Sequence, residues 1–549
     1  MKIVQQSIMT TRKAAAYLCC GAAGLLVAGS ANADFDPDTL EATDAVVGSV
    51  TIENGSIFDL ENPEEDKLLY RMANKAHMTT RPKVIEQQLL FQSGDKFSMQ
   101  TLEESERLLR GNRYIQEVQI EPVRHANGVV DINVSTTDTW TLVPKLSFSH
   151  SGGASSTDIG IKEGNLFGTG VGIEALYTSD VDRDSKILKV VDHHLGDSWY
   201  SLKAIFEDSS DGYMRYLDLG QPFYSLDSTA AFGMTLFNNE RIESLYDRGE
   251  IESQFGQESR AQEFFYGRSE GLRDGWAKRY TVGLGYDEQR FSEVINGLAP
   301  SIVIPEDRKL VYPFVGIEIL QDKFEEGKNF DQVARVEDRF LGSAFKARLG
   351  VTGESFGSDR NALLVDAAAR TSFSKSKKSS LFLSSEFSTR WEAGGAANLT
   401  LALDAKYYRR QSEKRLFFAR LNGTYGHDLD LDQQLFLGGD NGLRGYPLRY
   451  QSGDKRALLT LEQRFFTDWY PFRLFRVGAA VFFDAGQTWG EGPFGTGSDG
   501  LLKDIGAGLR LGNTRSGLGR VVHIDVAYPL DGDESISNVQ FIVELKQSF

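Results

Sequence analysis

The stretch LTLALDAKY, residues 399–407, alternates apolar and polar side chains along most of its length. Successive side chains of a β-strand point to opposite faces, so the pattern predicts a strand with one apolar and one polar face. A single strand of this kind is as typical of a soluble sandwich as of a membrane barrel. The fold is therefore decided by how often the pattern recurs, and at what length.

The alternation recurs through the whole C-terminal part of the chain. From Trp140 onward helical periodicity disappears, and segments of roughly ten residues, such as 280–286 and 381–391, are separated by clusters of Gly, Asp, Ser and Asn. We count roughly 16 to 19 such segments, and strands of roughly 9–11 residues tilted across a bilayer build large barrels. Residues 138–549 are therefore predicted to form an outer-membrane β-barrel of about 16 antiparallel strands.

The last segment, residues 539–549, fits the strand that closes such a barrel. Four apolar side chains fall on one face, and Ile542 falls on the other face with Glu544, Lys546 and Ser548. A strand that ends on an outward aromatic residue suits a position anchored at the membrane interface. The residues predicted to form this outer face are Phe541, Val543, Leu545 and Phe549.

Residues 1–33 have the pattern of a secretory signal peptide. A positively charged start that includes Lys2 and Lys13 precedes a short apolar run at 14–28, and Ala31-Asn32-Ala33 then provides a small-residue cleavage pattern. The alternative is a retained membrane anchor, because residues 14–33 carry no charge. We expect removal of this segment before the protein acts.

Composition then excludes several classes of function. Both cysteines, Cys19 and Cys20, lie within the predicted signal peptide, so the mature chain offers no disulfide and no thiolate metal site. Loss of three positive charges changes the formal net charge from −17 to −20, which argues against nucleic acid as a partner. No later run of apolar residues is long enough for a membrane helix. No cofactor is expected.

A small mixed α and β domain is predicted at residues 46–137, after a short N-terminal segment at 34–45. Residues 47–52 and 129–135 have strand patterns, and in the second of these Val130, Ile132 and Val134 face one way. Capping signals predict helix starts at Asn62-Pro63, at Thr80 and after Ser98.

Several stretches, taken in order, resemble the superfamily of outer-membrane assembly and translocation proteins that includes BamA, TamA and the two-partner-secretion transporters. The sequence at 89–122, followed by VVDINVSTTDTWTL at 129–142, resembles one POTRA (polypeptide-transport-associated) domain. GIKEGNLFGTG at 160–170 resembles early barrel strands of the family. LRGY at 443–446 matches its loop motif, and FFDAG at 482–486 matches the wall motif that faces that loop.

The chain also departs from this family. Members usually carry two or more POTRA domains, whereas this chain resembles them over one, with an extra helix expected at about 63–76. A surplus hairpin is expected between Lys186 and Phe206. The branch of the superfamily and the molecule it handles are therefore left open.

The resemblance implies an insertase or translocase in the outer membrane, with its N-terminal domain in the periplasm. A weak seam between the first and last strands would present unpaired edges to an unfolded or partly folded client protein. Outer-membrane lipid and a periplasmic accessory protein are the other implied partners. Two alternatives remain: a passive channel or surface structural protein, and phospholipid transport with a periplasmic bridge partner.

Patterns that suggest catalysis or metal binding have simpler explanations. Residues 353–357, GESFG, fit a nucleophile motif, but a strand-like run follows where the motif requires a helix, so a turn is predicted. His193-His194 has no further ligand at metal-binding spacing, and the acidic stretch 428–432 is predicted to be a solvated loop. We therefore expect no enzyme.

The single arginine in LGGDNGLRGY, residues 437–446, is the strongest candidate for a functional side chain. Arg444 could be a loop cation in water, but the flanking glycines favour a backbone packed closely inside a barrel lumen. We expect the inward loop at 432–455, with its motif residues Gly442, Leu443, Gly445 and Tyr446.

Two inward carboxylates could hold this arginine. Alternation within its strand turns Asp484 toward the lumen, and Glu462 is a second inward carboxylate on the preceding strand. The resemblance places the loop arginine against these two strands. We predict a loop-to-wall lock, in which Arg444 makes a bidentate contact with Asp484, with Glu462 nearby.

Overall fold

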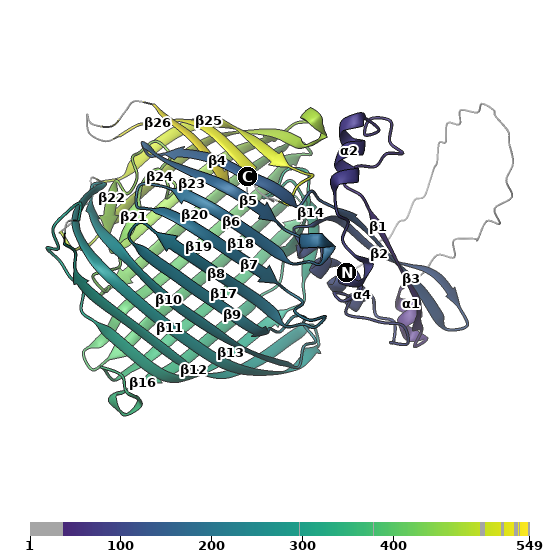
Figure 1. Ribbon diagram of the computed structural model, residues 1–549, viewed down its shortest axis with the longest axis horizontal. Coiled ribbons are helices and arrows are strands. Elements are labelled where there is room, and N and C mark those ends of the chain that lie inside the picture. The colour runs from purple at the N-terminus through teal and green to yellow at the C-terminus, as the bar shows by residue number, and fades with distance from the viewer. Residues whose placement is uncertain are drawn as a thin grey trace, which may run out of the picture.

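Strands that pair only with antiparallel neighbours close into one large barrel, and a smaller α and β region lies at one end of it (Figure 1). The computed structural model describes residues 37–546, apart from 296, 377, 495–499, 518–520, 532–535 and 537–538. The predicted signal peptide and Phe549 lie outside the described residues. We call the barrel end beside the N-terminal region proximal and the other end distal.

The barrel contains 20 strands among the described residues, so the prediction of about 16 was too low. The strands are β4 (Leu142–Ser151), β5 (Ala154–Glu163), β6 (Gly172–Ser179), β7 (Asp184–Asp192), β8 (Ser201–Ser209), β9 (Gly212–Gln221), β10 (Ala230–Asp247), β11 (Glu250–Arg273), β12 (Trp276–Glu293), β13 (Arg308–Gln321), β16 (Ala344–Thr352), β17 (Ala362–Ser376), β18 (Ser379–Glu392), β19 (Gly395–Ser412), β20 (Arg415–His427), β23 (Lys455–Phe466), β24 (Phe475–Trp489), β25 (Leu502–Asn513), β26 (Val521–Pro529) and β27 (Gln540–Lys546).

The undercount has a local cause. Some neighbouring strands are joined by very short turns, such as Asp274-Gly275 between β11 and β12, so that two strands read as one segment. Strand β9, GYMRYLDLGQ, shows no clean alternation of exposure, which hides it from a period-2 search. The expected hairpin between Lys186 and Phe206 is present as β7 and β8.

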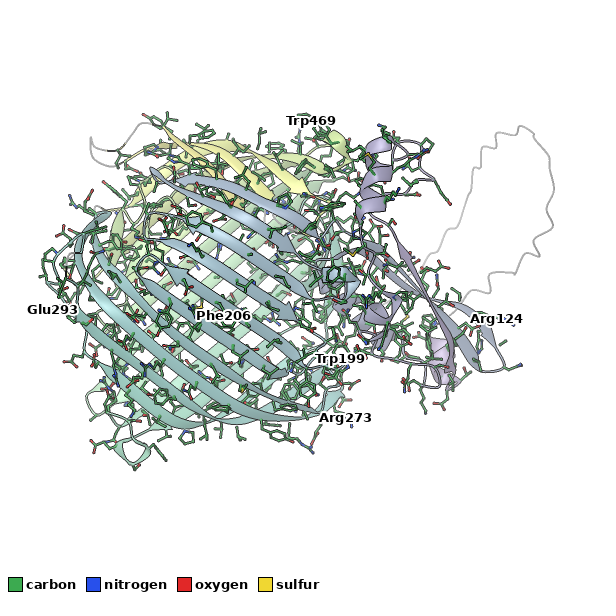
Figure 2. All side chains as sticks on the ribbon, viewed as in Figure 1. Arg124, Trp199, Phe206, Arg273, Glu293 and Trp469 are labelled. Carbon is green, nitrogen blue, oxygen red and sulfur yellow. The ribbon has the colours of Figure 1, made fainter. Side chains whose placement is uncertain are left out.

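The outer wall of the barrel exposes large apolar side chains. On β4, Leu146 is 80% and Phe148 is 56% exposed, whereas the polar side chains between them are half-buried. The same outward pattern continues around the wall, for example at Leu284 on β12. In Figure 2, Trp469 and Arg273 lie at the proximal end and Glu293 lies at the opposite end. An apolar exterior around a polar lumen is the pattern of a transmembrane barrel.

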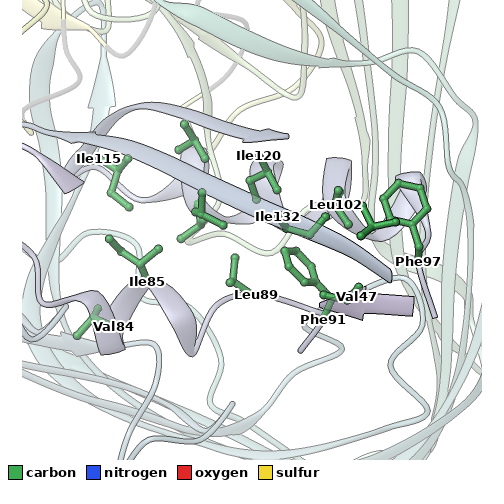
Figure 3. Close-up of a cluster of buried hydrophobic side chains, with 14 of the residues drawn as sticks. Val47, Val84, Ile85, Leu89, Phe91, Phe97, Leu102, Ile115, Ile120 and Ile132 are labelled. Atoms are coloured by element: carbon green, nitrogen blue, oxygen red, sulfur yellow. The ribbon is translucent and has the colours of Figure 1, made fainter. Parts of the chain in front are cut away.

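The N-terminal region contains a three-stranded sheet of β1 (Val46–Gly55), β2 (Ile115–Ala126) and β3 (Val129–Asp138). Strand β3 is central, parallel to β1 and antiparallel to β2. One face of the sheet packs against helices α3 (Pro82–Glu86) and α4 (Met99–Gly111) around the core in Figure 3, with α1 (Pro37–Ala42) beside it. None of the described helices is long and apolar enough to cross a membrane.

Helix α4 begins after Ser98, as predicted, because the Ser98 hydroxyl accepts a hydrogen bond from the amide of Thr101. Helix α3 starts two residues later than the predicted Thr80. The extra helix α2 is Leu68–Ala76, so the predicted start at Asn62-Pro63 was wrong. Glu65 does not reach back to cap a helix; its carboxylate instead accepts hydrogen bonds from the Asp59 amide and from Arg515 of the barrel.

Two connections between barrel strands contain small hairpins of their own. At the proximal end, β14 (Phe324–Lys328) and β15 (Val336–Phe340) lie between β13 and β16. In the distal loop between β20 and β23, β21 (Leu435–Leu437) pairs with β22 (Gln451–Gly453). Single 3₁₀ turns occur at Leu166–Gly168, Glu354–Phe356 and Pro471–Arg473. We call residues 324–340 the proximal hairpin and residues 428–454 the distal loop. Both contact the barrel lumen.

Candidate functional site

The distal loop places Arg444 against the inner face of β23 and β24. Its Nε donates to Asp484 Oδ2 at 2.7 Å, and its Nη2 donates to Asp484 Oδ1 at 3.0 Å, which is a bidentate contact. Nη1 donates to Glu462 Oε1 at 3.0 Å. The Arg444 side chain is 5% exposed and that of Asp484 is fully buried. The structure thus brings together the three residues of the predicted loop-to-wall lock.

Further groups surround this arginine. Its guanidinium carbon lies 3.4 Å from the centre of the Phe482 ring, and Asp525 Oδ2 on β26 lies 3.8 Å from Nη1. Asp525 is also paired with the fully buried Arg510 on β25. Buried charges are tolerated where opposite charges and hydrogen bonds balance them. This pair was not predicted from the sequence, because a polar residue at an inward position does not reveal whether it faces water or another charge.

Glycines allow the loop to approach the wall closely. At Gly445 the amide donates to Asp504 Oδ2 at 3.0 Å, and an added Cβ would lie 2.7 Å from the Cβ of Asp504. Gly442 has a φ of +107°, and a Cβ there would meet Leu458. Leu443 and Tyr446 are fully buried, and the Tyr446 hydroxyl donates to the carbonyl of Lys503 at 2.8 Å. The motif residues therefore fit a close contact with the wall rather than a mobile turn.

Contacts on several sides of the barrel hold the distal loop across the lumen. The Leu448 amide donates to the carbonyl of Gly152 in the turn between β4 and β5, and Arg449 pairs with Asp182 between β6 and β7. The acidic stretch at 428–432 also binds the wall, so the prediction of a solvated loop was wrong. Its pairs are Asp430 with Arg390 and Asp432 with Arg308.

The proximal hairpin joins the N-terminal region to the lumen. At its base, Arg110 of α4 forms ion pairs with Asp338 and with Glu326. At its tip, Phe330 packs in a buried cluster with side chains of β19, β20, β23, β24 and β26. The Tyr408 hydroxyl of β19 donates to Asp331 at 2.8 Å. The hairpin therefore occupies part of the proximal mouth.

A continuous set of contacts connects this hairpin to the distal loop. Arg464 on β23 donates through Nη1 to the carbonyl of Phe330 at 2.7 Å. Its Nε donates to Glu462 Oε2 at 2.9 Å, while the other oxygen of Glu462 accepts from Arg444. The distal loop, through Arg444, and the proximal hairpin, through Arg464, are thus both connected to the carboxylate of Glu462.

The proximal hairpin should respond to pH through Glu337, which lies outside the membrane-spanning strands. Its carboxylate accepts the backbone amides of Phe330, Asp331 and Gln332 at 2.9–3.1 Å. Burial raises the Glu337 pKa from 4.5 to about 7. The folded tip therefore binds the proton more strongly than the unfolded chain does, and its stability is expected to fall as pH rises from about 4.5 to 7, by at most about 3 kcal/mol.

Hydrogen exchange of the tip amides, corrected for the intrinsic rate at each pH, measures this effect. Protection of residues 329–335 should decrease between pH 5 and pH 8. Glu337→Gln should show no such dependence, because the side chain no longer titrates. A tip whose protection stays constant with pH in the unmodified chain would contradict the prediction.

The barrel closes at a junction unlike its other strand pairs. Strands β27 and β4 share one pair of partner residues among those described, Val543 and His150. By contrast, every residue of β26 from Val521 to Ala527 has a partner on β27, and β4 is paired with β5 along its whole length. We call the β27–β4 junction the seam. The closing strand has the predicted outward face at Phe541, which is 53% exposed, and Leu545 lies on the same strand.

The structure also shows where the other candidate motifs lie. The described residues contain no group of three or more side chains arranged to hold a metal ion. Residues 353–357 form a turn between β16 and β17, as predicted, and not a nucleophile elbow. His193 and His194 lie in the proximal turn between β7 and β8.

Comparison with known proteins finds a family match for the C-terminal part of the barrel. Residues 342–549 match the Omp85 superfamily domain. No curated protein matches the chain in sequence. Similar solved structures include CdiB from Escherichia coli, at 13% identity and a TM-score of 0.46 over 91% of this chain and 76% of that chain.

BamA from Haemophilus ducreyi lacking POTRA domains 1–3 is also similar, at 13% identity and a TM-score of 0.39 over 90% of this chain and 84% of that chain. The domain match includes the loop motif at 443–446, the wall motif at 482–486 and the closing strand. The part of the chain at residues 342–549 is thus similar to an Omp85 superfamily domain.

Proposed function

We propose that this protein inserts client proteins into the outer membrane or moves them across it, through the seam between β27 and β4. An Omp85 barrel implies an outer-membrane location and a general role in protein insertion or translocation. The observation that carries the proposal is the single pair of partner residues at the seam. Unpaired backbone groups are costly in lipid, so a sparsely paired edge favours addition of another strand.

The N-terminal region is the proposed receiving domain for the client. We assign residues 46–137 as one POTRA-like domain in the periplasm, after a short segment at 34–45 and a signal peptide at 1–33. Its sheet has β1 and β2 at the edges, where an extended client segment can add by backbone hydrogen bonding. Accessory proteins and outer-membrane lipid are further proposed partners.

The two lumen connections favour this function over a passive channel. The distal loop is bound to the wall at Arg444, Arg449 and Asp432, and the proximal hairpin packs into the opposite mouth. A wide and steady pore would require both connections to leave these positions. Lateral release through the seam does not require a pore of that kind.

Photo-cross-linking in intact cells tests the proposal. A photoreactive residue at Leu146, on the seam strand β4, should form adducts with client proteins. The matched control is Leu284 on β12, which is also exposed on the outer wall but lies between fully paired strands. The captured proteins should be those whose outer-membrane abundance falls when this protein is depleted. Adducts of equal kind and yield at the two positions would refute the proposal.

A further inference from the structure

A basic cavity lies at the proximal mouth, between the first barrel strands and the end of α4. Its volume is about 340 Å³, within the range of small-molecule sites. It is lined on one side by Asn112 and Tyr114 of the N-terminal region and on the other by strands β4 to β7. Four cations line it, namely Arg113, Lys145, Lys162 and Lys189.

Two carboxylates balance only part of this positive charge. Glu174 accepts a hydrogen bond from Lys145, and Glu163 accepts the amide of Asn165 at 2.7 Å. Within the described part of the chain, Lys162 and Lys189 are half-buried and form no salt bridge, although Glu174 attracts both charges at longer range. Four cations against two carboxylates leave a net charge of +2 in a chain whose formal net charge is −17. A local excess of this sign favours the binding of an anion.

The cavity faces the lumen and lies beside the seam. On β4, Lys145 alternates with the outward Leu146, so its ammonium is on the inner side of the seam strand. Gly164 and Gly172 line the cavity without side chains, and an added Cβ at either would meet no atom closer than 3.8 Å. The space beside these glycines is therefore open, and the seam strand β4 borders the cavity on the membrane side.

We propose that this cavity binds a phosphate group, with Lys162 and Lys189 as the recognising charges. Lysine ammonium groups act as compact point charges with three donors each, which suits a tetrahedral anion approached from several sides. The phosphate can belong to a lipid headgroup that reaches the cavity from the seam, or to free phosphate in the surrounding solution. Binding does not depend on the proposed handling of client proteins.

Native mass spectrometry of the full chain in a phosphate-free detergent tests the site. The probes are phosphatidylglycerol, inorganic phosphate and, as a lipid without phosphate, diacylglycerol. We expect binding of phosphatidylglycerol or phosphate but not of diacylglycerol. Lys162→Gln/Lys189→Gln should weaken that binding at least about tenfold, and added salt should weaken it further. If phosphatidylglycerol alone binds, the phosphate group that the cavity takes belongs to a lipid headgroup. If inorganic phosphate also binds and displaces the lipid, the cavity accepts the phosphate group from either source.

The control variant is Lys186→Gln, which removes one positive charge from β7, the strand that carries Lys189, at a position that does not line the cavity. It should bind as the unmodified chain does. Lys162→Arg/Lys189→Arg, which preserves the charge, should retain most of the binding, and heat-modified mobility in gels verifies that each barrel is folded. Equal binding by the glutamine variant, equal binding of diacylglycerol, or no binding of either phosphate probe would overturn the proposal.

Discussion

Replacing Arg444 by alanine is expected to free the distal loop from the wall and to lower both activity and the heat resistance of the barrel. The substitution leaves Asp484 buried without this cation and leaves Glu462 with Arg464 alone. Breaking a buried pair by removing one partner typically costs about 3–5 kcal/mol. Asp484→Ala should have a similar effect, because it removes both oxygens of the bidentate contact.

A double-variant test distinguishes loss of the specific contact between Arg444 and Asp484 from a general loss of barrel stability. The double variant Arg444→Ala/Asp484→Ala should be less destabilised than the sum of the two single variants. Arg444→Lys should be a poor substitute, since lysine lacks the planar fork. The measurement is the temperature at which the folded barrel loses its heat-modified mobility, together with assembly of clients in cells.

A second arginine of the same loop provides the matched control. Arg449 pairs with Asp182, but its side chain is 20% and that of Asp182 is 33% exposed. Partly solvated pairs contribute about 0–1 kcal/mol, so Arg449→Ala should change stability far less. Strict additivity of Arg444→Ala and Asp484→Ala, or equal effects of Arg444→Ala and Arg449→Ala, would exclude the lock.

Closing the seam with a disulfide is expected to abolish client handling while leaving the barrel in the membrane. His150 and Val543 are partner residues on antiparallel strands, whose Cα atoms are typically about 4.5–5.5 Å apart. This separation suits a disulfide. After the predicted signal peptide the chain contains no cysteine, so His150→Cys/Val543→Cys introduces only the intended pair.

Activity should fall by more than about tenfold on oxidation and return on reduction. The control is Thr157→Cys/Ser179→Cys, which joins β5 to β6, a continuously paired part of the wall. That disulfide should leave activity unchanged. A seam disulfide that forms completely without loss of activity would show that clients do not pass between β27 and β4.

Part of this fold could be predicted from local sequence patterns, and part could not. Alternation around Leu401 identifies a strand, and its recurrence along the chain identifies a barrel. The lock residues follow from inward alternation together with the family resemblance of the loop around Arg444. The pair of Arg510 and Asp525 could not be found in this way, because inward polar positions look alike whether they meet water or an opposite charge.

The proximal hairpin was missed for a different reason. No element is predicted from the sequence at residues 322–343, and only the tertiary structure shows that Phe330 is 8% exposed among wall side chains. The start of α2 was misplaced because the capping pattern at Asn62 is a local signal. A long-range contact between Glu65 and Arg515 prevails over it.

The shared carboxylate of Glu462 makes the two faces of the outer membrane thermodynamically dependent on each other. Arg444 reaches it from the distal loop, and Arg464 connects it to Phe330 of the proximal hairpin. If one arginine leaves, the other meets a more negative site, so the positions of the two connections are linked. Linkage is reciprocal: whatever factor a ligand bound at the proximal hairpin applies to release of the distal loop, a ligand holding that loop applies to binding at the hairpin.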